Sequence, residues 1–309
     1  MSAADVVVAG TAGTVGAAGT SQLAGDGPEG RVPAAGRAWL RYARSELGLV
    51  FRRRRNLALL AVVAVVPVII GVALRLAGSP RGGGGGGPAF FAQVTGNGLF
   101  LSFAALTVLL TLVLPLVVSV VSGDSIAGEA GYGTLRYVLT VPAGRTRLLL
   151  TKYLVVIVFA LCACAVVTVS AVIAGLALFP VGPMTLLSGT TVSIADGMLR
   201  LVFVALYVAA AMASLGAIGL AISTLTEHAI GAIAATAIIA VASEVIDNVP
   251  QFGAVHAYLP THWWTSFDSL LRTPIASADL LHGLLSFAVY AVIFCGVAWA
   301  RFTGGDVTC

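Results

Sequence analysis

The sequence predicts an all-α polytopic membrane protein, in which six transmembrane helices follow an amphipathic interfacial helix. The first observation is composition, because 59% of the 309 residues are hydrophobic and only 10% are charged. A soluble domain carries about 25% charged residues, and the mean hydropathy is +1.01, so lipid must solvate most of this chain. The second and third observations are long apolar segments that recur along the chain and basic residues that gather between some of them.

Residues 1–36 are rich in Ala, Gly, Val, Thr and Ser, and we expect them to form a disordered cytosolic tail. Their Gly-rich stretch GTAGTVGAAGT lacks the Gly-Lys-Ser/Thr ending of a phosphate-binding loop, which no other segment supplies. We therefore expect no ATP-binding site, no catalytic residues and no metal site in this chain. The four cysteines lack metal-ligand spacing and are interpreted as small apolar side chains.

Residues 37–55 predict the amphipathic interfacial helix. Four apolar residues recur there at helical spacing, namely Leu40, Ala43, Leu47 and Val50. The arginines between them lie mostly on the opposite side, and four more arginines at 52–55 immediately precede an apolar run. We expect this helix to lie in the membrane surface. The alternative is an ordinary helix that packs within the protein.

The six transmembrane helices are expected within residues 56–303, each close to the roughly 20 residues that cross the hydrocarbon core. Their expected positions are about 57–77, 98–122, 150–179, 199–223, 228–249 and 281–301. Pro67 and Pro115 lie inside two of them, where neighbouring helices can satisfy the freed backbone groups. The fourth and fifth are rich in Ala and Gly, which favours close packing inside a bundle.

The positions of Lys and Arg predict the orientation in the membrane. With a cytosolic N-terminus, thirteen of the seventeen lie on the cytosolic side, eight of them before the first span. The C-terminal residues 304–309 are then also cytosolic, and residues 250–280 form an outer surface segment of one or two short helices. Its Tyr258, Trp263 and Trp264 suit the membrane–water interface. We expect contact with membrane lipid and no binding of nucleic acid.

Residues 123–149, GDSIAGEAGYGTLRYVLTVPAGRTRLL, form a long cytosolic connection between the second and third spans. Within it, Glu129–Leu139 is expected to be a short helix that Pro142 ends. Four of its residues share one face at helical spacing, namely Tyr132, Leu135, Arg136 and Leu139. Such a helix suits docking on another protein; the alternative is a solvated connector whose charges only fix topology.

The order Glu129, Gly133-Thr134-Leu135, Pro142, Arg145 and Lys152 resembles the cytosolic-loop signature of the ABC-2 type transporter permease family. The wider layout is similar to that family over about 37–309, including the interfacial helix, the six spans and the cluster ARFTGGDVTC at the end. The chain departs from it in its long Ala- and Gly-rich N-terminus and in the hexaglycine at 82–87.

This resemblance implies the permease subunit of an ATP-driven ABC exporter. Two permease subunits, identical or paralogous, would form the pathway, and two separate ABC ATP-binding subunits, which bind ATP and Mg, would dock beneath them. The 123–149 loop would be the coupling element, through Glu129, Tyr132, Gly133, Thr134, Leu135, Arg136, Leu139, Pro142 and Arg145. The high content of Ala, Gly, Val and Arg indicates a bacterial source, and hence the bacterial cell membrane.

Glu244 and Asp247 lie three residues apart near the end of the fifth span, so they share a helix face. Glu244 falls about 24 Å from the start of that span, close to its outer end, and Asp247 lies beyond it. We expect carboxylates at the outer mouth; the alternative is a vestibule that attracts cations. The nearby His256, His262 and Asp268 have poor spacing for zinc.

Two other classes of protein compete with the transporter interpretation. A membrane scaffold or assembly factor would tolerate changes in the loop helix, whereas Glu129→Ala or Leu135→Asp should uncouple a transporter from ATP hydrolysis without preventing insertion. An intramembrane enzyme needs polar catalytic groups that face each other at mid-membrane, and the spans offer almost none. The apolar, Ala-rich spans favour a hydrophobic or amphiphilic cargo without naming it.

Overall fold

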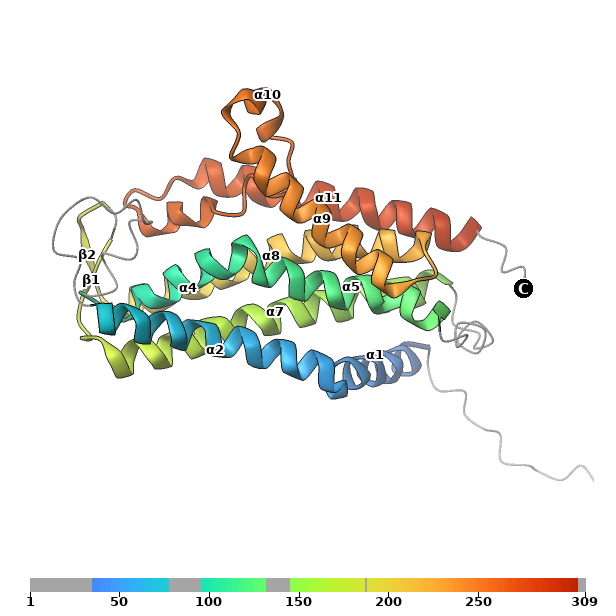
Figure 1. Cartoon of the computed structure of the whole chain (residues 1–309), viewed down its shortest axis with the longest axis horizontal. Coiled ribbons are helices and arrows are strands. Elements are labelled where there is room, and N and C mark those ends of the chain that lie inside the picture. Colours follow the sequence, from blue (N-terminus) through green and yellow to red (C-terminus); the bar gives the residue numbers. More distant parts are fainter. Residues whose placement is uncertain (1–34, 78–95, 132–144, 187, 305–309) are drawn as a thin grey trace, which may run out of the picture.

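The computed structural model describes residues 35–77, 96–131, 145–186 and 188–304, which form an elongated bundle of helices (Figure 1). Six of the described helices are long and apolar enough to span a membrane: α2 (Arg54–Ala77), α5 (Val113–Gly131), α7 (Arg145–Leu178), α8 (Ile194–Leu225), α9 (Ala229–Asp247) and α11 (Ser277–Gly304). Six membrane-spanning helices in a multi-pass, all-α protein are therefore confirmed.

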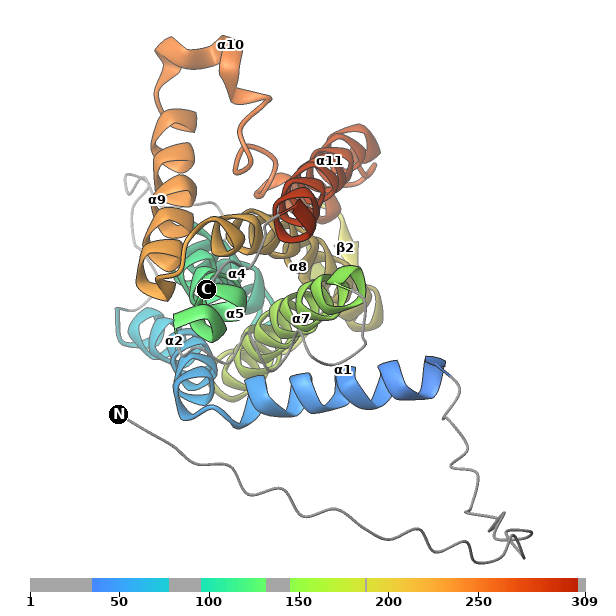
Figure 2. The ribbon, with the colours of Figure 1, turned by 90° about the vertical axis from the view of Figure 1, so that its right-hand side faces the viewer.

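The predicted interfacial helix is α1 (Ala35–Arg52), which lies across one end of the bundle (Figure 2). We call this the α1 end; the ends of α5, α8 and α11 and the starts of α2, α7 and α9 lie there. One non-helical residue, Arg53, separates α1 from α2. Across this elbow the amide nitrogen Nδ2 of Asn56 donates to the carbonyl of Val50 at 2.9 Å.

The second span consists of two helices, α4 (Phe100–Thr111) and α5, which meet at Leu112. Pro115 explains the break, because it has no amide hydrogen to donate to the carbonyl of Thr111. The expected end of this span at residue 122 is wrong as a helix boundary. Here α5 continues to Gly131, since small, buried residues from Ser122 to Gly128 pack into the bundle.

The core of the bundle is built around α8, which packs against α5, α7 and α11. Of its most apolar stretch 67% is buried inside the chain, against 11% for α11, so α11 lies at the edge of the bundle. At the opposite end, Gly98 and Gly175 bring the start of α4 against α7. A Cβ at Gly98 would come within 2.3 Å of the Gly175 carbonyl oxygen, so only glycine fits there.

The end opposite α1 carries a small hairpin of β1 (Met184–Thr185) and β2 (Thr191–Val192), in which Met184 pairs with Val192. The outer surface segment contains three short helices rather than one or two: η1 (Pro250–Phe252), α10 (Gly253–His256) and η2 (Ser266–Leu271). Figure 1 shows α10 projecting sideways from the bundle.

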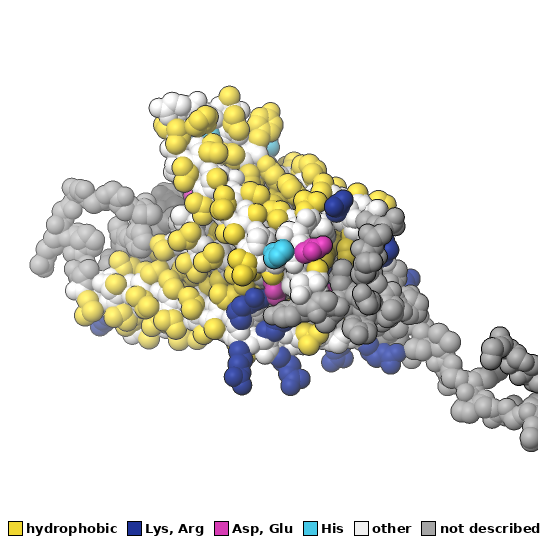
Figure 3. Space-filling view, turned by 45° about the vertical axis from the view of Figure 1, so that its right-hand side comes forward, with side chains coloured by type: hydrophobic (Ala, Val, Ile, Leu, Met, Phe, Trp, Pro, Cys, Tyr) yellow, Lys and Arg dark blue, Asp and Glu magenta, His cyan; other side chains and the backbone are white. Residues whose placement is uncertain are grey.

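The aromatic residues of this segment differ from the expectation. Tyr258 is exposed, but Trp264 is only 2% exposed, because it packs into the core with Phe267 and Leu271. The surface itself is that of a membrane protein, since hydrophobic side chains cover the length of the bundle in Figure 3. Lys and Arg side chains gather on that face toward the α1 end.

Candidate functional site: an ion-pair cluster at the α1 end

Six charged side chains meet at the α1 end, and they come from α1, the elbow, α2, α5 and α7. We call them the ion-pair cluster: Glu46, Arg53, Arg55, Asp124, Glu129 and Lys152. They line one small cleft, together with apolar residues of α1, α5 and α7. The cluster flanks both ends of the gap at 132–144, because Glu129 precedes that segment on α5 and Lys152 follows it on α7.

Lys152 is the centre of the first half of the cluster. Its ammonium nitrogen Nζ donates to Glu46 of α1 at 2.8 Å and also to Glu129 of α5. The residue is only 6% exposed, so water contributes little to its solvation. A buried ammonium held by two carboxylates joins the interfacial helix, the end of α5 and the start of α7 at one point.

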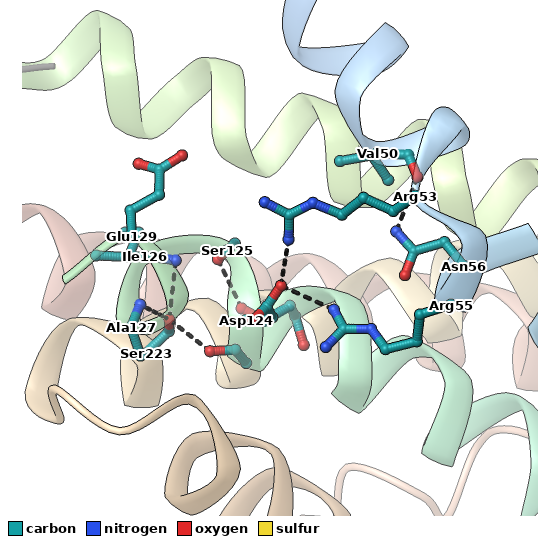
Figure 4. Close-up of polar contacts among 12 residues, drawn as sticks. Val50, Arg53, Arg55, Asn56, Asp124, Ser125, Ile126, Ala127, Glu129 and Ser223 are labelled. Atoms are coloured by element: carbon teal, nitrogen blue, oxygen red, sulfur yellow. Dashed lines mark hydrogen bonds and ion pairs between the residues drawn. The ribbon is translucent and has the colours of Figure 1, made fainter. Parts of the chain in front are cut away.

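Asp124 is the centre of the second half. One oxygen of its carboxylate accepts from Arg53 of the elbow and, at 2.7 Å, from Arg55 in the first turn of α2. Figure 4 shows both guanidinium groups pointing toward this carboxylate. Gly128 lies one turn further along α5. A Cβ there would come within 2.5 Å of the Asp124 carboxylate, so glycine leaves room for this geometry. The elbow between α1 and α2 is thereby fixed to α5.

The same part of α5 is fixed to α8 by Ser223. Its hydroxyl donates to the carbonyl of Gly123 at 2.8 Å and accepts from the backbone amides of Ile126 and Ala127 (Figure 4). The end of α5 therefore has polar partners on α8 and α7 and at the elbow, although most of the surrounding surface is apolar.

The charges of the ion-pair cluster balance, since three cations face three carboxylates. Tyr42 lies beside them on α1, and burial, together with the charges of Glu46 and Glu129, raises the pKa of its hydroxyl well above 10. The tyrosine therefore stays neutral at physiological pH. Neutrality matters because an uncompensated charge in a partly buried site costs several kcal/mol.

Of the predicted coupling residues, the structure describes two. Glu129 was expected to begin a separate short helix, but it lies in the last turn of α5 and binds Lys152. Arg145 begins α7, and its guanidinium donates to the carbonyl of Thr303 at 3.0 Å, near the end of α11. The others lie outside the described residues: Tyr132, Gly133, Thr134, Leu135, Arg136, Leu139 and Pro142.

Sequence reasoning missed four members of the cluster. Glu46, Arg53, Arg55 and Asp124 were interpreted, where they were considered at all, as parts of an amphipathic face, a topology signal or a loop. A signal was present, because charged residues make up only 10% of the chain and Asp124 directly follows an apolar segment. An isolated carboxylate at such a place needs a cationic partner. The pattern alone could not say which of the nearby arginines it binds.

Glu244 and Asp247 lie in the last turns of α9, as expected, at the junction with the outer surface segment. Asp247 is 2.6 Å from the ring nitrogen Nδ1 of His262, so this carboxylate connects α9 to the segment that follows it. Within residues 35–77, 96–131, 145–186 and 188–304, no three His, Cys, Asp or Glu side chains are grouped as metal ligands. The cation vestibule stays a prediction.

Comparison with known protein families decides the identity. A family model described as ABC-2 family transporter protein matches residues 51–243, more than half of the chain. The chain belongs to the ABC-2 transporter family. No curated protein matches it.

Family membership makes the chain a permease subunit of an ABC transporter, a membrane component that works with an ABC ATP-binding subunit. The matched region runs from the end of α1 to the last turn of α9. It contains five members of the permease's ion-pair cluster; Glu46 lies just before it. Most of α1 and all of α11 lie outside the matched region.

Proposed function

We propose that this permease exports a hydrophobic or amphiphilic compound, and that a separate ATPase subunit drives it by docking on the 123–149 loop. In this proposal the α1 end faces the cytosol, and both termini are cytosolic. The positive-inside rule supports that orientation, because the arginines of α1, the elbow and the start of α7 are all at the α1 end. The membrane is the bacterial cell membrane.

The ion-pair cluster is the observation that carries the coupling proposal. The two helix ends that flank residues 132–144 are tied to each other by Glu129 and Lys152. Lys152 and Asp124 also tie them to α1 and to the elbow. A displacement imposed on the loop would therefore move α5, α7 and α1 together, because a packed, ion-paired unit shifts as one body.

An apolar groove supports the nature of the cargo. It is an open groove between α7, α8 and α11, and its volume of about 340 Å³ is within the usual size of ligand sites. Its lining is almost entirely apolar, with Leu206, Ala210, Leu284 and Phe287 among the lining residues. A hydrophobic compound could reach this groove from the bilayer without crossing water.

The complex we propose contains two permease subunits, identical or paralogous, and two ATPase subunits, which bind ATP and Mg. The experiment that tests it begins with affinity purification of the tagged permease from its own membranes in mild detergent. Mass spectrometry then identifies and quantifies the proteins that accompany it. We expect a stoichiometric ABC ATPase in the wild type and its loss in Leu135→Asp.

A second variant separates docking from transmission. Asp124→Asn removes the carboxylate that holds Arg53 and Arg55 but leaves residues 132–144 unchanged. We expect it to retain the ATPase subunit and to lower transport per ATP hydrolysed. Glu129→Ala is less informative than its position in the loop suggested, since it also removes a partner of buried Lys152. If no ATPase accompanies the wild type under conditions that preserve a known ABC complex, the chain acts as a scaffold and the proposal is wrong.

A further inference from the structure

At the α1 end, the described carboxylates neutralise only part of the positive charge. Arg53 and Arg55 bind Asp124, and Glu46, the acidic residue of α1, binds Lys152. Four further arginines are exposed along α1 and the elbow, and we call them the arginine surface: Arg41, Arg44, Arg52 and Arg54. Among the described residues, no carboxylate forms an ion pair with any of the four.

Exposed leucines lie among these arginines. Leu40 is 55% exposed, Leu49 58% and Leu57 50%. Leu40 and Arg44 are four residues apart on α1, so they are neighbours on one helix face. Leu40 and Leu49 are nine residues apart on α1, so they lie on opposite sides of the exposed arginines, and Leu57 follows on α2. A nucleic acid would match the charge, but it would leave these flanking leucines in water. Hydrocarbon beside negative charge is what the headgroup layer of an anionic bilayer offers.

The position of α1 agrees with that layer. Figure 2 shows α1 lying across the end of the bundle, beside the first residues of the spanning helices α2 and α7. Its inner face is held there by buried Ala43 and by the Trp39 indole, which donates to the Thr151 hydroxyl of α7 at 3.0 Å. The arginine surface is therefore presented at a fixed depth.

We propose that the arginine surface binds the phosphate of anionic phospholipid headgroups. The site lies outside the ATPase-coupling loop, so this inference goes beyond the proposed function and does not depend on it. It makes the permease selective for anionic lipid at the α1 end. Each arginine near an anionic surface strengthens lipid binding about fivefold, and the effect weakens as salt screens the charges.

The test uses the purified full-length permease, reconstituted in vesicles that contain equal amounts of phosphatidylglycerol and phosphatidylcholine. After extraction in mild detergent, mass spectrometry measures the ratio of the two lipids that stay bound. Arg44→Gln/Arg52→Gln removes two members of the arginine surface. Arg75→Gln/Arg272→Gln is the matched control, because it removes the same charge from two exposed positions at the opposite end of the bundle. Arg44→Lys/Arg52→Lys keeps the charge.

We expect phosphatidylglycerol to be enriched on the wild type, the control and the lysine variant. The glutamine variant should lose this enrichment, by about 25-fold in relative affinity if two arginines contribute independently. It keeps Arg53, Arg54 and Arg55, so its orientation in the membrane should not change.

Two results would overturn the proposal. One is a wild type that shows no preference for phosphatidylglycerol. The other is a glutamine variant that keeps the preference at the level of the control. If the wild type shows no lipid preference but the glutamine variant releases the ATPase subunit, the arginine surface is a protein interface.

Discussion

Ser223 of α8 donates a 2.8 Å hydrogen bond to the carbonyl of Gly123 on α5. The same hydroxyl accepts from the amides of Ile126 and Ala127, so one side chain bridges the donor and acceptor ends of a helical turn. The residues that leave toward the proposed coupling loop begin at this turn. Hydrogen bonds as well as packing therefore hold α5 against α8. These bonds lie next to the proposed coupling loop, through which the ATPase subunit would move the helices.

Replacing Ser223 with alanine should destabilise the permease by about 2–3 kcal/mol, because it leaves buried backbone groups of α5 without this partner. The measurement is thermal unfolding of the purified protein in detergent. Ser119→Ala is the matched control, since that buried hydroxyl makes a single bond to its own helix, to the Pro115 carbonyl. It should cost about 1 kcal/mol. An equal loss of stability in the two variants would show that the bonds from Ser223 to α5 stabilise the permease no more than a single hydroxyl bond within one helix.

Gly128→Ala should weaken the cluster without removing a charge. Alanine in a helix is normally about 1 kcal/mol more favourable than glycine, but a Cβ at 128 would displace the Asp124 carboxylate. We expect lower thermal stability and lower transport per ATP hydrolysed. Gly296→Ala on α11 is the control, because nothing lies within 4 Å of its Cβ position, and it should be neutral or stabilising. A stabilised Gly128→Ala variant would contradict the geometry described for Asp124.

Lys152→Met should cost about 3–5 kcal/mol, because it leaves Glu46 and Glu129 facing each other without their shared cation. The double variant Lys152→Met/Glu46→Gln removes one of the two carboxylates and should recover part of this loss. A double-mutant cycle by thermal unfolding measures the coupling between the two positions. Additive effects of the two substitutions would mean that the 2.8 Å pair between them contributes nothing to stability.

Ala210→Phe should obstruct the apolar groove between α7, α8 and α11, where Ala210 is part of the lining. The readout is photolabelling of the reconstituted permease with a fatty acid that carries a photoreactive group, followed by peptide mapping. We expect labelling of groove residues in the wild type and a several-fold loss in the variant. Ala242→Phe adds the same volume to an exposed position on α9 and should leave the labelling unchanged. Equal labelling in both variants would exclude the groove as a site for apolar compounds.

Much of the fold could be predicted because the bilayer restricts what a chain can do. Segments of sufficient apolar length must be helices, and their number follows from counting them. Helix ends were harder to predict. The second span was expected to end where apolar residues give way to Gly, Asp and Ser, but Ser223 and the two arginines satisfy that polar segment within the protein. Burial of this kind depends on neighbours distant in sequence.

The site could be predicted only in part for the same reason. Glu129 and Lys152 were noted because they resemble a family signature, and the structure brings them into contact. Their third partner, Glu46, is 106 positions from Lys152, and no local pattern connects α1 with α7. Trp264 was expected at the membrane–water interface, but it is buried. Its place in the sequence could not distinguish the two, because an aromatic residue near a membrane surface can equally well fill the core.

The break at Leu112 gives the two halves of the second span different mechanical roles. The first half, α4, is enclosed by its neighbours and begins next to the contact between Gly98 and Gly175 of α7. The second half, α5, carries charges next to the proposed coupling loop. A helix bends most readily where proline has removed a backbone hydrogen bond. We therefore expect the second span to bend at Leu112 when the ion-paired ends of α5, α7 and α1 move, while α4 keeps its packing.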